Sequence, residues 1–280
     1  MFQNWSDYQK RHDYLVCVDS DGCAMDTMDC KHIHCFGPCM VAEWGLREWE
    51  KPILERWNVI NLYSMTRGIN RFKGLSMALT EIDAQYTPIA NLADLQAWVN
   101  SGAAPSNDAL QKAIDETGSP ILKKTLSWSR AVNDSINTLP EELKKPLPGA
   151  KEGLAAAAQF ADVAIVSSAN RDAVLEEWTK YKLLDHVDIM LAQDCGSKAH
   201  CIAEMLKFGY APDHVLMVGD APGDQDAAAQ NGVYYYPILV RHEGESWAEL
   251  RDAGFARLQS GTYGPYEKDR IAAFLKNLGG

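Results

Sequence analysis

The chain has 280 residues, of which 46% are apolar, and this is enough to bury one large core or the cores of two smaller domains. The formal net charge of -11 repels a nucleic-acid backbone and an anionic membrane surface, so the composition excludes both as general partners. A small anionic substrate would therefore require a local positive site on this acidic protein.

The N-terminal segment and the cysteines indicate a cytoplasmic protein. The apolar run that begins at Tyr14 is short, whereas a membrane span requires roughly 20 apolar residues, and the apolar region of a signal peptide is also longer than this run. Several of the seven cysteines lie in apolar runs, and the chain is too large to require disulfides. We therefore expect a protein of the reducing cytoplasm that is not bound to a membrane.

The first strong elements are a buried strand and a long helical stretch after it. Residues 14–18 form a compact apolar run that stops at Asp19, as a buried strand of a parallel sheet does. From residue 26 to about residue 145, apolar residues recur at spacings of three and four, and no β-rich run interrupts them. This pattern predicts an all-helical insert.

Downstream of a Pro-Leu-Pro-Gly break, short apolar runs alternate with helical segments. The predicted strands and helices are residues 163–166, 171–181, 187–191, 198–208, 215–218, 224–230 and 233–236. The alternation predicts an α/β fold with a parallel, doubly wound sheet. Residues 1–25 and 148–280 would form this core domain, and residues 26–147 the inserted all-α domain. We expect the tail after Val240 to pack on the core as helices.

Polar side chains follow the predicted strands at their carboxyl ends, where doubly wound sheets bind their ligands. Asp19 and Asp21 follow the first strand two residues apart, so one carboxylate can meet a phosphorus atom or a metal while the other transfers a proton. Ser167 and Ser168 follow the second strand, and their hydroxyl and amide groups can hold phosphoryl oxygens.

Two further groups complete this set of strand ends. Lys198 opens a predicted helix, where a cation opposes the helix dipole unless an anion lies beside it. Asp220 and Asp224 add carboxylates after a later strand. Each group alone is also compatible with an ordinary turn, a helix cap or a solvated side chain. Their order and their strand contexts favour a common site.

Together these groups resemble the four motifs of the haloacid dehalogenase superfamily, and the insert follows the first motif as the cap does in the C1 subclass of phosphatases and β-phosphoglucomutase-like enzymes. The resemblance implies a Rossmann-like core with a helical cap. It also implies that Asp19 attacks phosphorus and becomes phosphorylated. Asp21 would protonate the leaving oxygen, activate water in the second step and bind Mg²⁺ through its backbone carbonyl.

The resemblance assigns roles to the other motif residues. It implies that Ser167 is the motif II hydroxyl and that Lys198 is the cation holding the nucleophile and the phosphoryl group. Asp19, Asp220 and Asp224 would bind Mg²⁺ through carboxylates, and hard oxygen ligands favour Mg²⁺ over Zn²⁺. The chain departs from the family pattern at Cys23, where Thr or Val is common, and it lacks the Lys-Pro pair common at motif III.

Asp21 narrows the choice among the reactions that the superfamily catalyses. Haloacid dehalogenases and phosphonoacetaldehyde hydrolases lack an acid at the position of Asp21. We therefore expect an Mg²⁺-dependent phosphohydrolase that acts on a small phosphorylated metabolite through an aspartyl phosphate. A phosphosugar mutase of the β-phosphoglucomutase kind is the alternative within the family. A non-catalytic protein that binds a phosphorylated ligand is the alternative of another class, although such a protein would be expected to have lost one of its motif aspartates.

The insert contains candidates for substrate specificity. Residues 70–76 resemble the substrate-specificity loop of C1 caps, in which Arg71 and Lys73, with Arg67 as a further candidate, would meet a second anionic or hydroxyl-rich group of the substrate. The alternative is an exposed basic turn. Lys31 and His32 follow the first hinge, and a surface position on the first helix is the favoured interpretation for both.

The Cys- and His-rich stretch at residues 30–39 suggests zinc at first sight. Its spacing fits none of the usual zinc ligand pairs well. Cys35 and Cys39 are four residues apart, which suits one buried face of a helix. We therefore favour a structural role for these cysteines.

Overall fold

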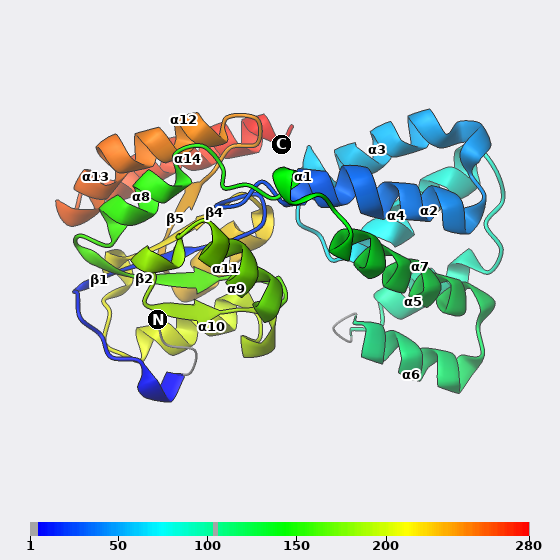
Figure 1. The fold of residues 1–280 in the computed structure, drawn as a ribbon, viewed down its shortest axis with the longest axis horizontal. Helices are drawn as coiled ribbons and strands as arrows, with labels where there is room; N and C mark the ends of the chain where they lie inside the picture. The colour runs from blue at the N-terminus through cyan, green and yellow to red at the C-terminus, as the bar shows by residue number, and fades with distance from the viewer. Residues whose placement is uncertain (1–4, 103–105, 280) are drawn as a thin grey trace. The chain divides into compact units, whose positions relative to one another are not determined.

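The computed structural model describes residues 5–102 and 106–279, which form two compact units. One unit contains the described residues up to Met28 and from Glu141 onward, and the other is Asp29–Pro140. Each unit has its own buried hydrophobic cluster. Figure 1 shows the elements of both.

The first unit is built on a five-stranded sheet in which every neighbouring pair of strands is parallel. Its strands are β1 (Tyr14–Val18), β2 (Ala161–Val166), β3 (Ile189–Leu191), β4 (Val215–Gly219) and β5 (Tyr234–Pro237). Their order is β3-β2-β1-β4-β5, so β1 lies at the centre and β2 and β4 flank it. This confirms the predicted α/β fold, and it brings the carboxyl ends of three motif-bearing strands to one edge.

Helices cover both faces of this sheet. They are α8 (Ala150–Ala157), α9 (Arg171–Lys180), α10 (Lys198–Leu206), α11 (Pro222–Asn231), α12 (Glu243–Glu249), α13 (Phe255–Gln259) and α14 (Tyr263–Asn277). In Figure 1, α8 lies together with α12–α14, whereas α10 and α11 lie on the other side of the strands. Trp247 and Phe255 belong to the hydrophobic cluster of the sheet, which confirms that the tail packs on the core as helices.

Local signals in the sequence set the ends of these helices. The side chain of Asn170 accepts hydrogen bonds from the backbone at the start of α9, and Ser197 does the same for α10. Pro222 opens α11, where its missing N–H costs nothing. Gly232 ends α11 with a φ of 65°, a left-handed conformation that favours glycine.

The chain leaves and re-enters the first unit through two paired segments. Met25 forms an antiparallel bridge with Pro146. The amide of Asp26 donates to the carbonyl of Lys145 at 2.7 Å, and the amide of Leu147 donates to Ala24 at 2.9 Å. Residues 26–28 and 141–147 lie in the first unit, so the compact insert unit is shorter than the predicted residues 26–147.

The second unit confirms the predicted all-helical insert, since its described residues contain helices and no named strand. The helices are α1 (Met28–Lys31), η2 (His32–Phe36), α2 (Gly37–Trp44), η3 (Arg47–Trp49), α3 (Glu50–Leu62), α4 (Arg71–Gln85), α5 (Leu92–Val99), α6 (Asn107–Thr117) and α7 (Pro120–Asn137). At the centre, the rings of Trp57 and Trp128 meet edge to face at 6.2 Å, which adds roughly 0.5–1.5 kcal/mol beyond the area they bury. The indole of Trp128 also donates to the carbonyl of Phe36 at 3.2 Å.

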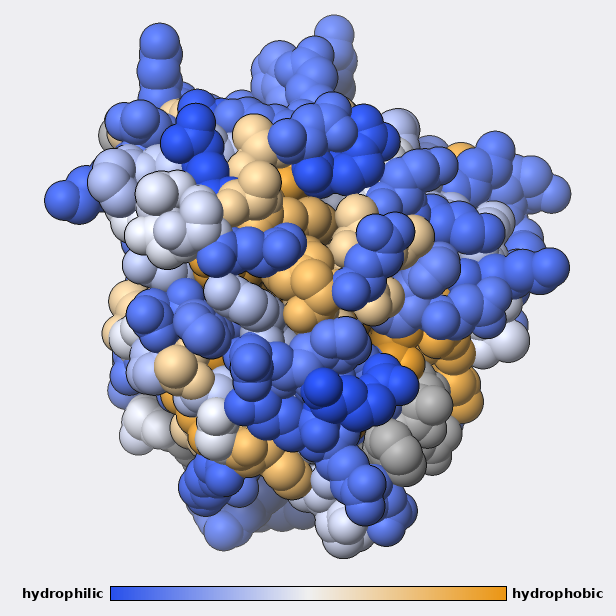
Figure 2. Space-filling view, turned by 90° about the vertical axis from the view of Figure 1, so that its left-hand side faces the viewer, coloured by the Kyte–Doolittle hydropathy of each residue, from blue (hydrophilic) through white to orange (hydrophobic). Residues whose placement is uncertain are grey.

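One face of the protein is largely polar (Figure 2). Seen from the left-hand side of Figure 1, hydrophilic side chains cover most of the face, and apolar residues form a limited stretch within it (Figure 2). Limited apolar areas of this kind are ordinary on folded proteins. Among the residues that the structure describes, no helix combines the length and the apolar character that crossing a membrane would require.

Candidate functional site

Three buried carboxylates gather at the carboxyl ends of β1 and β4. Oxygen atoms of Asp19, Asp220 and Asp224 all lie within 4.8 Å of one another. The pairing of the two strands explains this, because the amide of Asp19 continues the ladder by donating to the carbonyl of Val218 at 3.0 Å. Two residues that follow neighbouring strands are thereby placed side by side.

Asp224 reaches this cluster from the first turn of α11. One of its oxygens, Oδ2, accepts a hydrogen bond from the amide of Ala221 at 3.0 Å. The carboxylate lies directly against the backbone of Gly219, where a Cβ would overlap it. Gly219 is therefore needed so that Asp224 can fold back against the end of β4.

Lys198 binds two of the three carboxylates. Its ammonium nitrogen, Nζ, lies 2.7 Å from Oδ2 of Asp19 and 2.5 Å from Oδ1 of Asp224. A cation on the first residue of α10 opposes the helix dipole, but the two anions beside Lys198 outweigh this unfavourable interaction. The structure therefore brings together four residues predicted from three separate motifs: Asp19, Lys198, and the pair Asp220 and Asp224.

Burial is the largest influence on the pKa values of the cluster. Burial raises the pKa of the Asp19 carboxyl to about 7; the ammonium of Lys198 opposes this shift, and the carboxylates of Asp224 and Asp220 add to it. Burial alone would lower the pKa of Lys198, but the carboxylates of Asp19 and Asp224 raise it well above its usual value. Lys198 is therefore a permanent cation beside carboxylates that repel one another.

The cluster fits a hard divalent cation. Its donors are carboxylate oxygens, which Mg²⁺ prefers, and a cation among them would relieve the repulsion that disfavours ionised Asp19. Asp19, Asp220 and Asp224 are the carboxylates that could hold it. The oxygens of Asp224 accept bonds from Lys198 and from the amide of Ala221, and those of Asp19 accept from Lys198 and from the amide of Ser20, so Lys198 is held by both residues.

Asp21 lies on the turn that follows β1. Its Oδ1 accepts a hydrogen bond from the hydroxyl of Thr27, which is fully buried. No local pattern in the sequence indicates Thr27, because side chains six residues apart fall outside the common local hydrogen-bonding patterns. Gly22, the residue after Asp21, has a φ of 81°, a left-handed conformation that suits glycine.

The two serines after β2 differ in exposure. Ser167 is buried, and its hydroxyl accepts a hydrogen bond from the amide of Ala169 at 3.2 Å. Ser168 is exposed. Because β2 pairs directly with β1, both serines belong to the same edge of the sheet as Asp19.

The structure corrects the predicted specificity loop in the insert. The prediction of a loop at residues 70–76 is wrong, because α4 begins at Arg71. Asn70 caps this helix by accepting from the amide of Phe72 at 3.0 Å, and the buried side chains of Phe72 and Leu75 hold the first turn in the core. The segment that precedes α4, residues 63–70, is the true connection between helices.

The basic residues of this region differ in their surroundings. Arg71 donates to Oδ1 of Asn133 at 2.8 Å, and its guanidinium lies 4.9 Å from the ring centre of Phe36, while burial lowers its pKa. Arg67 is buried and donates to the carbonyl of Leu62 at 2.8 Å. Lys73 is exposed on α4. Lys73 therefore remains the more accessible of the two predicted specificity residues, Arg71 and Lys73.

The segment after the first hinge is built into the insert core. The ring of His32 stacks on that of Phe36 at 4.5 Å. Cys35 is fully buried in a small cluster with Cys30 and Leu139, whereas Cys39 is only half-buried. All seven cysteines are free thiols.

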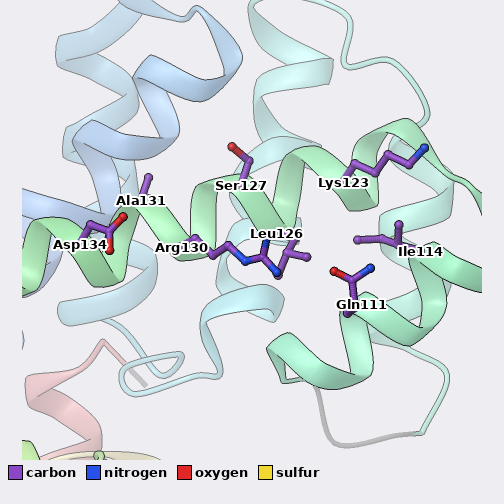
Figure 3. Close-up of a pocket in the computed structure, with 8 residues that line it drawn as sticks. All are labelled: Gln111, Ile114, Lys123, Leu126, Ser127, Arg130, Ala131 and Asp134. Carbon is purple, nitrogen blue, oxygen red and sulfur yellow. The ribbon is translucent and has the colours of Figure 1, made fainter.

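A shallow groove of about 510 Å³ lies between α6 and α7 of the insert unit. Gln111 on α6 and Leu126 and Arg130 on α7 line it (Figure 3). The amide of Gln111 already donates to Asp115 at 2.9 Å, and none of the predicted site residues lines the groove.

Comparison with known proteins agrees with the geometry of the strand ends. The model of the haloacid dehalogenase-like hydrolase family matches residues 67–237, more than half of the chain. A search of curated proteins finds no match.

Solved structures with a similar fold include three bacterial proteins. A putative phosphoglycolate phosphatase from Lactobacillus delbrueckii subsp. bulgaricus has 14% identity and a TM-score of 0.49, over 81% of this chain and 86% of that one. For a predicted phosphoglycolate phosphatase from Haemophilus somnus the identity is 16%, the TM-score 0.46 and the coverages 80% and 84%. A haloacid dehalogenase-like family hydrolase from Streptococcus pneumoniae has 11% identity and a TM-score of 0.46, over 80% of this chain and 83% of that one.

Identities this low carry no information on the substrate, so membership rests on the family model, which spans the second, third and fourth motifs. The chain belongs to the haloacid dehalogenase-like hydrolases.

Proposed function

We propose that the protein is an Mg²⁺-dependent phosphohydrolase that cleaves a small phosphomonoester through an aspartyl phosphate on Asp19. The observation that carries this proposal is the position of Lys198, whose ammonium contacts both Asp19 and Asp224 within a buried cluster of carboxylates. An acid beside a fixed cation can be a nucleophile at neutral pH, because the cation favours its ionised form.

The first chemical step transfers the phosphoryl group to the protein. An oxygen of the Asp19 carboxylate attacks phosphorus, and the bond from phosphorus to the ester oxygen breaks. Asp21 gives its proton to the leaving oxygen, so that an alcohol departs. Lys198 and the hydroxyl of Ser167, with Ser168 as a further contact, are the groups we assign to the phosphoryl oxygens, whose charge must be balanced in the transition state.

The second step returns Asp19 to its carboxylate form. Asp21, now ionised, removes a proton from water, the water oxygen attacks phosphorus, and the bond to Asp19 breaks with release of inorganic phosphate. In a mutase, a sugar hydroxyl would take the place of this water.

Asp19 and Asp220, with the backbone carbonyl of Asp21, are the groups that we expect to hold Mg²⁺, and Asp224 supports them. When bound, the ion supplies positive charge that aligns the phosphoryl group and offsets its negative charge.

The test is a turnover screen with an aryl phosphate, sugar phosphates and nucleotides, each with Mg²⁺ and with a chelator. We expect phosphate release that requires Mg²⁺, and a phosphorylated protein after rapid acid quench. Asp19→Asn should abolish both signals, because an amide is not a nucleophile. The proposal fails if no substrate is turned over, or if Asp19→Asn retains more than a few per cent of the rate. Transfer of phosphate to a second sugar hydroxyl would identify a mutase.

A further inference from the structure

The turn that carries both catalytic aspartates is closed by its own backbone. Ser20, the residue between them, accepts hydrogen bonds at its carbonyl from the amides of Ala24 and Met25 at 3.0 and 2.9 Å. The amide of Gly22 donates to the carbonyl of Met25 at 2.8 Å. We call this segment, residues 19–25, the aspartate turn. Its shape decides where the side chains of Asp19 and Asp21 point.

A tryptophan from the C-terminal tail supports the aspartate turn. Trp247 lies on α12, and its indole N–H donates to the carbonyl of Cys23 at 2.8 Å. The side chain is fully buried, and an indole nitrogen can only donate. The hydrogen bond therefore fixes the orientation of the indole ring and the position of the Cys23 carbonyl.

Helix α8 is shaped to admit this indole. A Cβ at Gly153 would overlap the six-membered ring of Trp247, and a Cβ at Gly149 would lie 3.0 Å from Cβ of Trp247. Gly149 also has a φ of 80°, so a side chain there would be strained in any case. Gly153 on α8 and Gly149, the residue that caps its start, thus leave room for one large side chain of α12.

A second indole holds the same turn. Trp178 on α9 is fully buried, and its N–H donates to the hydroxyl oxygen of Ser20 at 2.9 Å. Trp178 and Trp247 belong to one hydrophobic cluster, together with Cys23. Two rigid donors from one core therefore reach the aspartate turn at two different residues, one on each side of Asp21.

We propose that Trp178 and Trp247 are positioning residues of the hydrolytic site, which fix the aspartate turn through Ser20 and Cys23. This inference rests on the proposed function. It gives the C-terminal tail, which lies beyond the matched residues 67–237, a direct part in the geometry of the site. Small displacements of reacting groups are costly, since a misplacement of about 1 Å can lower a rate by roughly 100-fold.

The experiment compares Trp247→Phe and Trp178→Phe, which keep an aromatic ring and lose the donor, with a matched control. Tyr236→Phe removes another buried hydrogen bond, from the Tyr236 hydroxyl to the carbonyl of Ser246 on α12, without touching the aspartate turn. All three are measured for kcat and KM on the best substrate, normalised to folded protein. Hydrogen–deuterium exchange follows the amides of residues 18–27.

We expect each tryptophan variant to lower kcat by roughly 10- to 100-fold with KM nearly unchanged, and to speed exchange at Ala24 and Met25. Tyr236→Phe should retain the wild-type kcat and the wild-type exchange in this segment. The inference is overturned if an active wild type yields tryptophan variants within twofold of its kcat, or if Tyr236→Phe loses as much. Exchange needs no turnover, so protection that survives both tryptophan changes overturns the inference even if the proposed function fails.

Ser20→Ala keeps the test decisive if Trp247→Phe does not fold. It removes the acceptor of Trp178 with a minimal change of volume. If the Trp178 hydrogen bond acts as proposed, the kcat losses of Ser20→Ala and Trp178→Phe should not multiply in the double variant. Fully multiplicative losses would show that Trp178 acts on the core in general.

Discussion

Buried carboxylates lie at both ends of the same sheet, and their surroundings differ. At the amino end of β2, Asp162 is a single buried carboxylate with several donors: it accepts from the amide of Arg11 at 2.9 Å and from the hydroxyl of Tyr210 at 2.5 Å. The guanidinium of Arg11 lies 3.5 Å from its other oxygen. At the carboxyl ends, three carboxylates lie together, and two of them contact one ammonium group.

The difference distinguishes a structural carboxylate from the carboxylates of the proposed site. Donors outnumber the carboxylate at the amino end, so Asp162 ties the N-terminal segment to the sheet. Carboxylates outnumber the cation at the carboxyl ends, and their repulsion helps to raise the pKa of Asp19. A protein keeps such a cluster, at a cost in stability, where a ligand will supply the balancing charge.

Replacing an aspartate of each kind by asparagine gives the largest expected effects. Asp162→Asn should lower the free energy of unfolding by about 3–5 kcal/mol, because its donors lose a buried charge, while kcat per folded molecule stays near the wild-type value. Asp19→Asn should do the opposite. It should abolish turnover and leave the unfolding free energy within about 1 kcal/mol without Mg²⁺. Urea unfolding and turnover on both variants measure this contrast, and equal loss of stability would remove it.

The carboxylate cluster at the carboxyl ends of the strands can be disrupted without changing any charge. Gly219→Ala should displace Asp224, release Lys198 and lower kcat by roughly 100-fold. Gly223→Ala is the matched control from the same motif, since a Cβ at Gly223 meets nothing within 4 Å. The two rates are compared on one aryl phosphate. Equal rates would show that the approach of Asp224 to β4 does not matter.

Mg²⁺ should stabilise the folded protein by binding at the carboxyl ends of the strands. At a concentration about 100 times its dissociation constant, a ligand that binds only the folded protein adds about 2.7 kcal/mol to the unfolding free energy. Asp220→Asn should remove this increment, whereas Asp162→Asn should keep it. Thermal unfolding with Mg²⁺ and with a chelator provides the measurement, and an increment that survives Asp220→Asn would place the ion elsewhere.

The smallest effects on stability concern the insert, where one basic residue, Arg71, is held by other side chains and another, Lys73, is exposed. Arg71 is held by Asn133 and Phe36, so Arg71→Met should cost about 1–2 kcal/mol of stability. The exposed Lys73→Ala should cost less than about 0.5 kcal/mol. If Lys73 contacts the substrate, its removal should lower kcat/KM about 10- to 150-fold for the best substrate and little for an aryl phosphate. An equal loss of kcat/KM on both substrates would show that Lys73 affects catalysis in general and not the recognition of one substrate.

Much of the fold followed from short-range patterns. The five strands appeared as apolar runs, because a strand buried on both faces has few polar residues. The clustering of Asp19, Lys198 and Asp220 was predictable once these strands were taken as parallel, since the carboxyl ends of parallel strands share an edge.

Other features depend on contacts between distant residues. Trp247 and Cys23 are separated by 224 positions, so no local pattern announces their hydrogen bond. The sequence shows a glycine at residue 219, but only the folded chain shows that Asp224 fills the space of its missing side chain. The false loop at residues 70–76 came from analogy. The local signal, Asn70 followed by buried Phe72 and Leu75, fits a capped helix.

The pairing of the two segments that connect the units has a consequence for protein engineering. Asp26 and Lys145 are hydrogen-bonded neighbours on antiparallel segments, so the chain leaves and returns at almost the same point. A hairpin turn of about two to five residues is enough to join such neighbours. Replacing the intervening helices by a short turn should therefore yield a minimal core with an uninterrupted sheet, and the same junction should accept inserts from other proteins as exchangeable modules.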